Sequence, residues 1–324
     1  MDALRPEVQG FLDRTWPCGS ATRLAGDAST RSFFRVEGRD GGSRVVMDYG
    51  EPFTGESDDE ALARVFLGAG LPVARILASS PEDGCLLLED LGDRMLEAAI
   101  LASPEGPGRR LWVERAVLLA AEVANRGTPA LFSSGRAGGP ALDEERFRFE
   151  MDFFLEHWAG GCSEHPLREE LARLAATAAE TPRRVLCHRD FHSRNLMVLP
   201  DETLAMVDIQ DARWGPDSYD LASLLRDAYV DLDDDSLDAW IDLYLDRLDR
   251  PDDPAGFRRR FHLVASQRMI KALGTFGYQA HVLGRDRYRD AARRTVDRLR
   301  VWLADDPGTR ELGRRLESAG LLPA

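Results

Sequence analysis

The chain has 324 residues, which is enough for two lobes or domains that each bury a substantial core. Its formal net charge of -14 at pH 7 disfavours nucleic acids and anionic membrane surfaces as partners. No run of eighteen apolar residues occurs and residues 1–6 lack the basic and apolar regions of a secretory signal, so we expect a cytoplasmic protein without a membrane span.

The first ninety residues are predicted to form a small, strand-rich sheet after a short opening helix. Strand patterns occur at residues 31–37, 44–47, 75–78 and 85–89. The glycine-rich residues 38–42 provide a turn between the first two strands. Residues 58–70 carry apolar side chains at helical spacing and end in glycines ahead of Pro72, which predicts a helix.

From Asp93 onward the pattern is mainly helical. Apolar stripes at helical spacing predict helices at residues 109–125, 142–158, 164–178, 218–229, 235–248, 255–273 and 287–303. Residues 127–140 are rich in Gly, Pro and Ser and are predicted to be a surface connection. Among the helices, residues 185–186 are predicted to form a buried strand, and residues 196–199 and 204–207 to form a hairpin.

The most informative segment is residues 188–195, which has the pattern H-R-D-x-x-x-x-N and is followed by Asp208 at the end of an apolar run. Phosphoryl transfer needs one group that orients a hydroxyl and accepts its proton, and oxygen ligands for magnesium. Asp190 and Asn195 on one loop, with Asp208 after the next strand, suit that chemistry. The alternative is a set of ordinary polar loop residues, but the fixed spacing and the strand–loop–hairpin context favour a kinase-type site.

Three further features of the sequence bear on function. The four cysteines are scattered and form no Cys-x-x-Cys pair, so neither a zinc site nor a disulfide framework is predicted. Among the 42 Lys and Arg residues of the chain, Lys271 is the only lysine. The acidic residues 231–235 are expected to cap the next helix and face solvent, rather than bind a metal.

Together these segments resemble the aminoglycoside-phosphotransferase-like kinases, within the protein-kinase-like fold. Among them the chain most resembles the bacterial anomeric kinases for N-acetylmuramate and N-acetylglucosamine of cell-wall recycling. The matching segments are residues 26–35, 46–48, 88–92, 188–197, 207–212, 214–221, 267–268, 271 and 273–274. The resemblance implies an α+β, protein-kinase-like two-lobe fold. A small β-rich N-lobe, residues 1–90, would cover the nucleotide, and a larger, mainly helical C-lobe, residues 91–324, would carry the catalytic hairpin and the substrate.

The resemblance also implies roles for residues of the catalytic segment. Asp190 would be the general base that faces the acceptor hydroxyl, and Asn195 and Asp208 would be the Mg²⁺ ligands. Asp211 would assist at the metal or the sugar, with a hydrogen bond within the loop as an equal alternative.

Two residues of the same region would support the loop without touching substrate. His188 would pack and hydrogen-bond within the loop rather than move protons. Asp220, at the start of a helix, would brace the loop.

On the nucleotide side, the resemblance places the triphosphate of ATP at the turn of residues 26–31. There Ser29, Thr30, Arg31 and backbone N–H groups would bind phosphate oxygens. The turn has one glycine, so without the distal motifs it would be interpreted as an ordinary hairpin turn. The hinge, where backbone groups would meet the adenine, is formed by Glu89, Asp90 and Leu91.

One position departs from the usual kinase pattern. Met47 occupies the strand position that carries a phosphate-binding lysine in such kinases, and no lysine exists in the first lobe. Arg31, Arg35 and Arg44 are candidates to replace it, because a guanidinium can clamp phosphate bidentately. The partner carboxylate on the following helix would be Glu60.

The acceptor would lie against the helical lobe. Arg268 and Lys271 are three residues apart on one predicted helix, and they would meet the lactyl carboxylate of N-acetylmuramate or sugar hydroxyls. An intramolecular ion pair is an almost equal alternative. Trp214 would stack on a sugar face, although a Trp before Gly-Pro more often packs a loop in place.

The expected function is therefore ATP-dependent phosphorylation of the anomeric hydroxyl of an N-acetylated amino sugar in peptidoglycan recycling. A monomer is expected, and the choice between the two sugars and between ATP and GTP stays open. A second hypothesis keeps the enzyme class but makes the acceptor an aminoglycoside, choline or another small alcohol. A third, suggested by Met47, is a nucleotide-binding pseudokinase, against which the intact set of Asp190, Asn195 and Asp208 speaks.

Overall fold

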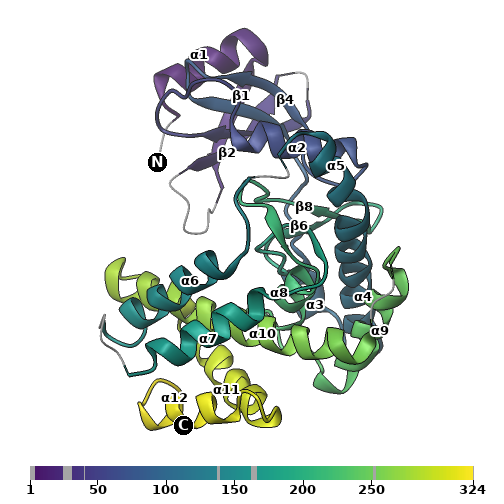
Figure 1. The fold of residues 1–324 in the computed structure, drawn as a ribbon. Helices are drawn as coiled ribbons and strands as arrows, with labels where there is room; N and C mark the ends of the chain where they lie inside the picture. Colours follow the sequence, from purple (N-terminus) through teal and green to yellow (C-terminus); the bar gives the residue numbers. More distant parts are fainter. Residues whose placement is uncertain are drawn as a thin grey trace. The chain divides into compact units, whose positions relative to one another are not determined.

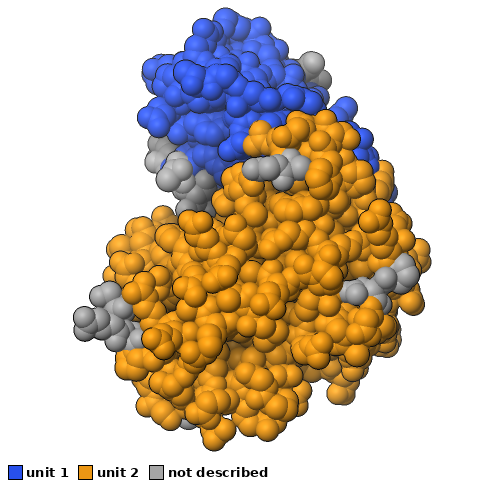
Figure 2. All heavy atoms as spheres, in the orientation of Figure 1, with its two compact units in different colours: residues 1–94, 197–210 blue, residues 95–196, 211–324 orange. Residues whose placement is uncertain are grey.

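The structure is a computed structural model that describes residues 4–24, 31–39, 41–136, 139–161, 166–250 and 253–323. The chain divides into two compact units, which Figure 2 colours separately. The first unit contains residues 1–94 and 197–210, and the second contains residues 95–196 and 211–324. The sequence placed the boundary at residue 90 and residues 197–210 in the second lobe, whereas the structure groups that segment with the first unit.

The first unit is built on a five-stranded antiparallel sheet with the strand order β1-β2-β3-β5-β4 (Figure 1). Its strands are β1 (Cys18–Arg23), β2 (Ser32–Gly38), β3 (Ser43–Asp48), β4 (Ile76–Ser80) and β5 (Cys85–Glu89). The four strands predicted from the sequence are confirmed as β2 to β5. The sequence analysis missed β1 because its side chains are mostly exposed, so the strand lacks alternating apolar residues.

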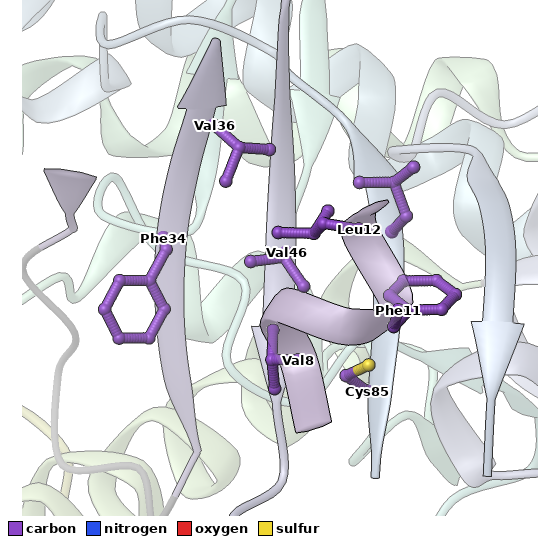
Figure 3. Packing of buried hydrophobic residues seen from close by; sticks show 8 residues of the cluster. Val8, Phe11, Leu12, Phe34, Val36, Val46 and Cys85 are labelled. Carbon is purple, nitrogen blue, oxygen red and sulfur yellow. The ribbon is translucent and has the colours of Figure 1, made fainter. Parts of the chain in front are cut away.

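Helix α1 (Pro6–Thr15) packs on this sheet and confirms the predicted opening helix. Pro6 suits its first turn, where the backbone N–H has no helical partner. The apolar residues of α1 meet inward-facing residues of three strands (Figure 3): Val8, Phe11, Leu12, Phe34, Val36, Val46 and Cys85. Burial of each large apolar side chain of this cluster stabilises the folded state by roughly 1.5–3 kcal/mol.

The second helix of the first unit, α2 (Asp58–Gly68), begins at a capping box. The hydroxyl of Ser57 accepts a hydrogen bond from the Glu60 backbone N–H, and the Glu60 carboxylate accepts one from the Ser57 backbone N–H. The helix predicted for residues 58–70 is thus confirmed. Its start is set by these two residues.

A hairpin of β7 (Leu196–Val198) and β8 (Leu204–Met206) confirms the predicted hairpin. Its backbone joins the first unit at two points. The Met206 N–H donates to the Pro72 carbonyl at 2.8 Å, and the Val198 N–H donates to the Arg94 carbonyl at 2.7 Å. These hydrogen bonds hold the segment that leads to Asp208.

The second unit is mainly helical. Its helices are α3 (Leu96–Ala102), α4 (Pro107–Glu122), α5 (Thr128–Ser133), α6 (Glu144–His157), α7 (Arg168–Ala179), α8 (Tyr219–Leu225), α9 (Leu237–Arg247), α10 (Pro254–Gly277), α11 (Arg289–Asp305) and α12 (Arg310–Ser318). The strands β6 (Arg184–Cys187) and β9 (Arg213–Pro216) pair antiparallel, and β6 confirms the strand predicted at residues 185–186. Every helix predicted from the sequence is present, and α3, α5, α12 and β9 are additions.

Two predictions for this unit need correction. Residues 127–140 are not only a surface connection, because they begin with α5, whose Thr128 hydroxyl accepts a hydrogen bond from the Leu186 N–H of β6 at 3.0 Å. The helix predicted for residues 218–229 stops at Leu225. The next residues turn because the Asp227 carboxylate accepts the N–H two residues on, a local bond that competes with helix.

Helices α6 and α10 pack closely because glycines lie at their contact. A Cβ on Gly274 would come within 2.8 Å of the Phe154 Cα, and one on Gly277 would meet the His157 carbonyl. The close approach positions one long face of α10 in the interior of the unit, and this face supplies residues of the candidate site. In the described part of the chain, no helix combines the length and apolarity needed to cross a membrane.

Candidate active site

The loop predicted to be catalytic, residues 188–195, follows β6 and is supported by α8. Asp220, in the first turn of α8, accepts hydrogen bonds from the backbone N–H groups of His188 at 2.6 Å and Arg189 at 3.0 Å. Arg189 has a φ of 80°, which is uncommon for a residue other than glycine and requires such outside support. The buried His188 ring meets Phe191 edge-on. Asp220 and His188 thus contact the loop itself, and their supporting roles in catalysis stay predictions.

Asp227 supports the other end of the loop, and the sequence analysis did not identify it. Its carboxylate accepts the backbone N–H of Ser193 at 2.7 Å, across 34 residues of chain. The neighbouring Arg194 lies over the Tyr229 ring at 3.8 Å and pairs with Glu97. No local pattern marks Asp227, because its partner is reached only in the folded chain.

Asp190 projects from this loop to meet two cations of α10. The Lys271 Nζ lies 3.0 Å and the Arg268 Nη1 3.2 Å from the same oxygen, Oδ1. Burial by itself would raise the pKa of the Asp190 carboxyl, but Lys271 and Arg268 hold that pKa well below its ordinary value. The carboxylate is therefore ionised at neutral pH. Among the residues that the structure describes, none donates a hydrogen bond to Oδ2, which leaves this oxygen for a hydroxyl.

Arg268 is itself fixed from two sides. Its guanidinium donates to the Tyr219 hydroxyl at 3.2 Å and to the Ser223 hydroxyl at 2.6 Å. Lys271 lies one turn further along α10, and burial lowers its pKa. Arg268 and Lys271 share one face of α10, as expected. They form intramolecular ion pairs with Asp190, which was the alternative to a contact with substrate. Their contact with substrate stays a prediction.

Asn195 is the last residue of the loop, and a hydrogen bond to the backbone of Asp190 orients its side-chain amide. The Asn195 Nδ2 donates to the Asp190 backbone carbonyl at 2.9 Å, and its backbone N–H donates to the His192 carbonyl at 2.9 Å. The amide nitrogen is thereby occupied, so the amide oxygen is the atom available to a cation.

Asp208 lies in the first unit, directly after β8. It has a φ of 63°, and its Oδ1 accepts a hydrogen bond from Gln210 at 2.8 Å and lies 3.6 Å from the Arg31 Nη2. A carboxylate and an amide oxygen are the hard donors that Mg²⁺ prefers, so Asp208 and Asn195 fit this metal chemically. They belong to different units, and their meeting at one ion stays a prediction. In the described ranges, no three His, Cys, Asp or Glu side chains form a metal cluster.

A buried network connects the loop to α6 and α10. Arg189 pairs with Asp211 at 3.0 Å on one side and with Glu150 at 3.5 Å on the other. Asp211 also contacts Arg213 at 3.2 Å, and the Gln267 amide donates to Glu150 at 2.8 Å. Asp211 thus accepts a local hydrogen bond from Arg213, as in its alternative role, and its contact with a metal or a sugar stays a prediction. Glu150 is a buried acid that the sequence did not mark.

On the nucleotide side, Arg31 lies between two carboxylates of the first unit. Its Nη1 donates to both oxygens of Asp59 at 2.8 and 2.9 Å, and its Nη2 faces Asp208. Glu60 was expected to be the helix carboxylate that pairs with this cation. That prediction is wrong, because the Glu60 carboxylate closes the capping box with Ser57. Asp59, one residue earlier, faces Arg31 instead.

The remaining nucleotide predictions concern the turn and the hinge. Ser29 and Thr30 lie outside the described residues. In the hinge, Glu89 is held by Arg75 at 3.0 Å and Asp90 by Arg35 at 2.6 Å. Both side chains are held in ion pairs, and a contact between the backbone of residues 89–91 and a nucleotide stays a prediction.

Trp214 lies on β9, where its ring meets Phe132 edge-on with centroids 4.9 Å apart. The Trp214 carbonyl accepts the Leu142 N–H at 2.7 Å. Both contacts are those of a packed residue, and stacking on a sugar stays a prediction.

Comparison with known proteins agrees with this geometry. Residues 20–260 match the model of a family described as the phosphotransferase enzyme family. The chain is 32% identical to a Pseudomonas aeruginosa protein named N-acetylmuramate/N-acetylglucosamine kinase, over 98% of this chain and 94% of that protein.

Two solved structures share the fold. A choline/ethanolamine kinase family protein from Mesorhizobium loti has a TM-score of 0.61 at 17% identity, covering 93% of this chain and 92% of that one. A spectinomycin phosphotransferase, solved with ADP and spectinomycin, has a TM-score of 0.60 at 11% identity, covering 98% and 99%. The expected α+β, protein-kinase-like fold is thereby confirmed. The family match spans most of the chain and includes the loop with Asp190 and Asn195, and the chain therefore belongs to the phosphotransferase enzyme family.

Proposed function

We propose that this protein is an ATP-dependent kinase that phosphorylates the anomeric hydroxyl of N-acetylmuramate, N-acetylglucosamine or both. The observation that carries the proposal is Asp190, an ionised carboxylate whose Oδ1 is held by Lys271 and Arg268. The name of the Pseudomonas aeruginosa relative supports the two sugars as acceptors. The corresponding role is the recycling of peptidoglycan sugars by a cytoplasmic, monomeric enzyme.

In the proposed reaction, Asp190 orients the acceptor hydroxyl through Oδ2 and receives its proton as the oxygen attacks the γ-phosphorus of ATP. The bond from that phosphorus to the β,γ-bridging oxygen breaks, and ADP leaves. A transition state of this kind is loose, so positioning and charge neutralisation contribute more than the strength of the base. A carboxylate with a depressed pKa is therefore sufficient, and an anomeric hydroxyl is more acidic than an ordinary alcohol.

Magnesium, when bound, neutralises charge on the transferring phosphate, and Asn195 and Asp208 are the side chains that would hold it. Asn195 suits this role because its amide nitrogen is occupied by the Asp190 carbonyl. Asp208 suits it because its carboxylate is partly exposed after β8.

The charges around Asp190 favour a neutral or anionic acceptor. Two cations lie within 3.2 Å of one carboxylate oxygen, so a positively charged acceptor such as choline would meet repulsion there. The lactyl carboxylate of N-acetylmuramate would instead find a partner in Lys271 or Arg268.

The test is a kinase assay with ATP and Mg²⁺ against N-acetylmuramate, N-acetylglucosamine, choline and kanamycin, with products analysed by phosphorus NMR. We expect a sugar 1-phosphate from at least one amino sugar. Phosphorylation of choline or kanamycin without turnover of either amino sugar would reject the acceptor, and no turnover of any compound would favour a pseudokinase.

The role of Asp190 is tested by Asp190→Asn, which keeps the side-chain volume and removes the base. We expect the rate to fall about 100-fold or more while ATP affinity changes little. Asp246→Asn, an exposed carboxylate on α9, is the matched control and should leave the rate unchanged. Turnover by Asp190→Asn at the rate of the control would remove the proposed base.

A further inference from the structure

The central strand of the first unit lacks a charge where a nucleotide-binding kinase needs one. In protein kinases a lysine on the third strand pairs with phosphate and with a carboxylate of the following helix. Here β3 presents Met47, which is buried opposite Phe33 and Leu86 and carries no charge. The only lysine of the chain, Lys271, belongs to the second unit.

The guanidinium of Arg31 lies at the end of the Met47 side chain. Its Nη1 is 3.7 Å from the Met47 sulfur, so it occupies the space that a longer, charged side chain from that position would reach. From there the same group contacts Asp59 of α2 and faces Asp208 at 3.6 Å. A single cation thus joins the helix carboxylate to the candidate metal ligand.

Asp59 holds this cation in place. Both of its oxygens accept from Arg31, and Oδ2 also accepts the Tyr49 hydroxyl at 2.6 Å. The two paired side chains are only 12% and 15% exposed, which makes the pair stronger than one at the surface. The planar fork of a guanidinium can contact one anion through one nitrogen and a second anion through the other, as Nη1 and Nη2 of Arg31 do with Asp59 and Asp208.

The other two arginines that could replace the strand lysine, Arg35 and Arg44, have different partners. Arg35 is bound at the hinge by Asp90 and Asp93. Arg44 donates to the Ser43 carbonyl and lies over the Trp16 ring at 5.5 Å.

We propose that Arg31, positioned by Asp59, is the cation of the first unit that binds the phosphate groups of the nucleotide. It replaces a strand lysine by reaching the same place from the start of β2. The inference rests on the nucleotide use in the proposed function, but not on the identity of the acceptor.

The test is calorimetric binding of ATP and of adenosine to the full chain. We expect Arg31→Met to weaken ATP binding about 10- to 100-fold, the loss expected for a hydrogen bond between charged groups. Adenosine has no phosphate, so its affinity should not change. Arg14→Met, which removes a 59% exposed guanidinium from α1, is the matched control and should bind both ligands as the unchanged protein does.

A double variant that moves the positive charge to β3 makes the test more specific. In the double variant Arg31→Met with Met47→Lys, the ammonium would start from β3 and reach the place that Arg31 leaves. We expect it to regain at least tenfold in ATP affinity over Arg31→Met. Three results would overturn the proposal in protein that keeps its melting temperature: unchanged ATP affinity in Arg31→Met, an equal loss for adenosine, or no gain in the double variant.

The positioning role of Asp59 has its own control. Asp59→Asn should raise the KM for ATP several-fold with little change in kcat, because the cation remains but loses its anchor. Asp58→Asn removes an exposed carboxylate from the same first turn of α2 and should have no such effect. Equal effects of the two variants would attribute the change to the helix end and refute the positioning role. The KM comparison requires turnover of an acceptor, whereas the calorimetric binding of ATP to the Arg31 variants does not, so failure of the sugar assay leaves the Arg31 test interpretable.

Discussion

Arg35 and Asp90 form the most tightly held ion pair of the hinge. The Arg35 guanidinium contacts both Asp90 oxygens, at 2.6 and 2.9 Å, and the Ser43 hydroxyl donates to the same carboxylate at 2.6 Å. Burial by itself would raise the pKa of Asp90, but Arg35 and Ser43 lower it to about 2. The pair stabilises the bend that leads out of β5.

This pKa predicts how stability depends on pH. The folded pKa of about 2 lies below the ordinary value of 3.8, so the contribution of Asp90 is complete above about pH 4 and is lost as the pH falls toward 2. At pH 7, Asp90→Asn should lower the free energy of unfolding by about 2 kcal/mol. Urea denaturation at pH 7, 5 and 3 should show that the difference from the unchanged protein shrinks at the lowest pH.

The neighbouring Asp93 is the control for this measurement. It also contacts Arg35, but its side chain is 80% exposed, so Asp93→Asn should cost well under 1 kcal/mol at every pH. An Asp90→Asn penalty as large at pH 3 as at pH 7 would contradict the assignment.

At the scale of elements, the contact of α6 with α10 fixes the helix that carries the two cations of the candidate site, Arg268 and Lys271. Gly274 is three residues beyond Lys271 on α10 and lies against the backbone of Phe154 on α6. Because backbone atoms cannot move aside as a side-chain end can, a methyl group there would push the helices apart.

We therefore expect Gly274→Ala to lower the free energy of unfolding by about 1–3 kcal/mol. Gly68→Ala, at the end of α2, is the control, because its Cβ would meet nothing within 4 Å and alanine favours helix. Denaturation of both variants measures the difference. A Gly274→Ala protein as stable as the Gly68→Ala protein would show that the two helices separate at little cost.

At the scale of the whole molecule, a segment from the middle of the chain belongs with the first unit. Residues 197–210 follow the catalytic loop, yet their backbone bonds to Pro72 and Arg94. The loop that carries Asp190 is therefore continuous with a hairpin of the other unit.

This connection predicts a pattern of hydrogen exchange. Val46→Ala opens a cavity in the core of the first unit and should cost about 1–3 kcal/mol. Exchange should then increase in residues 197–210 together with β3, and not in β6, which pairs within the second unit. Mass spectrometry of peptides measures both. If residues 197–210 kept the exchange rate of β6, the hairpin would fold with the second unit.

Most elements could be predicted from the sequence because their signals are local. Alternating side chains marked β2, short runs of strand-forming residues marked β3 to β5, and helical spacing marked α4, α6 and α9 to α11. The elements that were missed or misjudged lack such a signal: β1 is exposed, and α8 is cut short by the Asp227 side chain. A period in the sequence reports which face is buried, so elements without a buried face give no pattern.

The sequence by itself determined which loop is the candidate for catalysis, because Asp190 and Asn195 lie five residues apart, a spacing that predicts a kinase-type site. Only the tertiary structure decided what surrounds them. Lys271 contacts Asp190 although 81 residues separate them in the chain. Arg31 pairs with Asp59 and not with Glu60, the residue that follows Asp59 on the same helix. Adjacent residues of one helix point in different directions, so the partner of a charge follows from the packing of elements and not from their order in the chain.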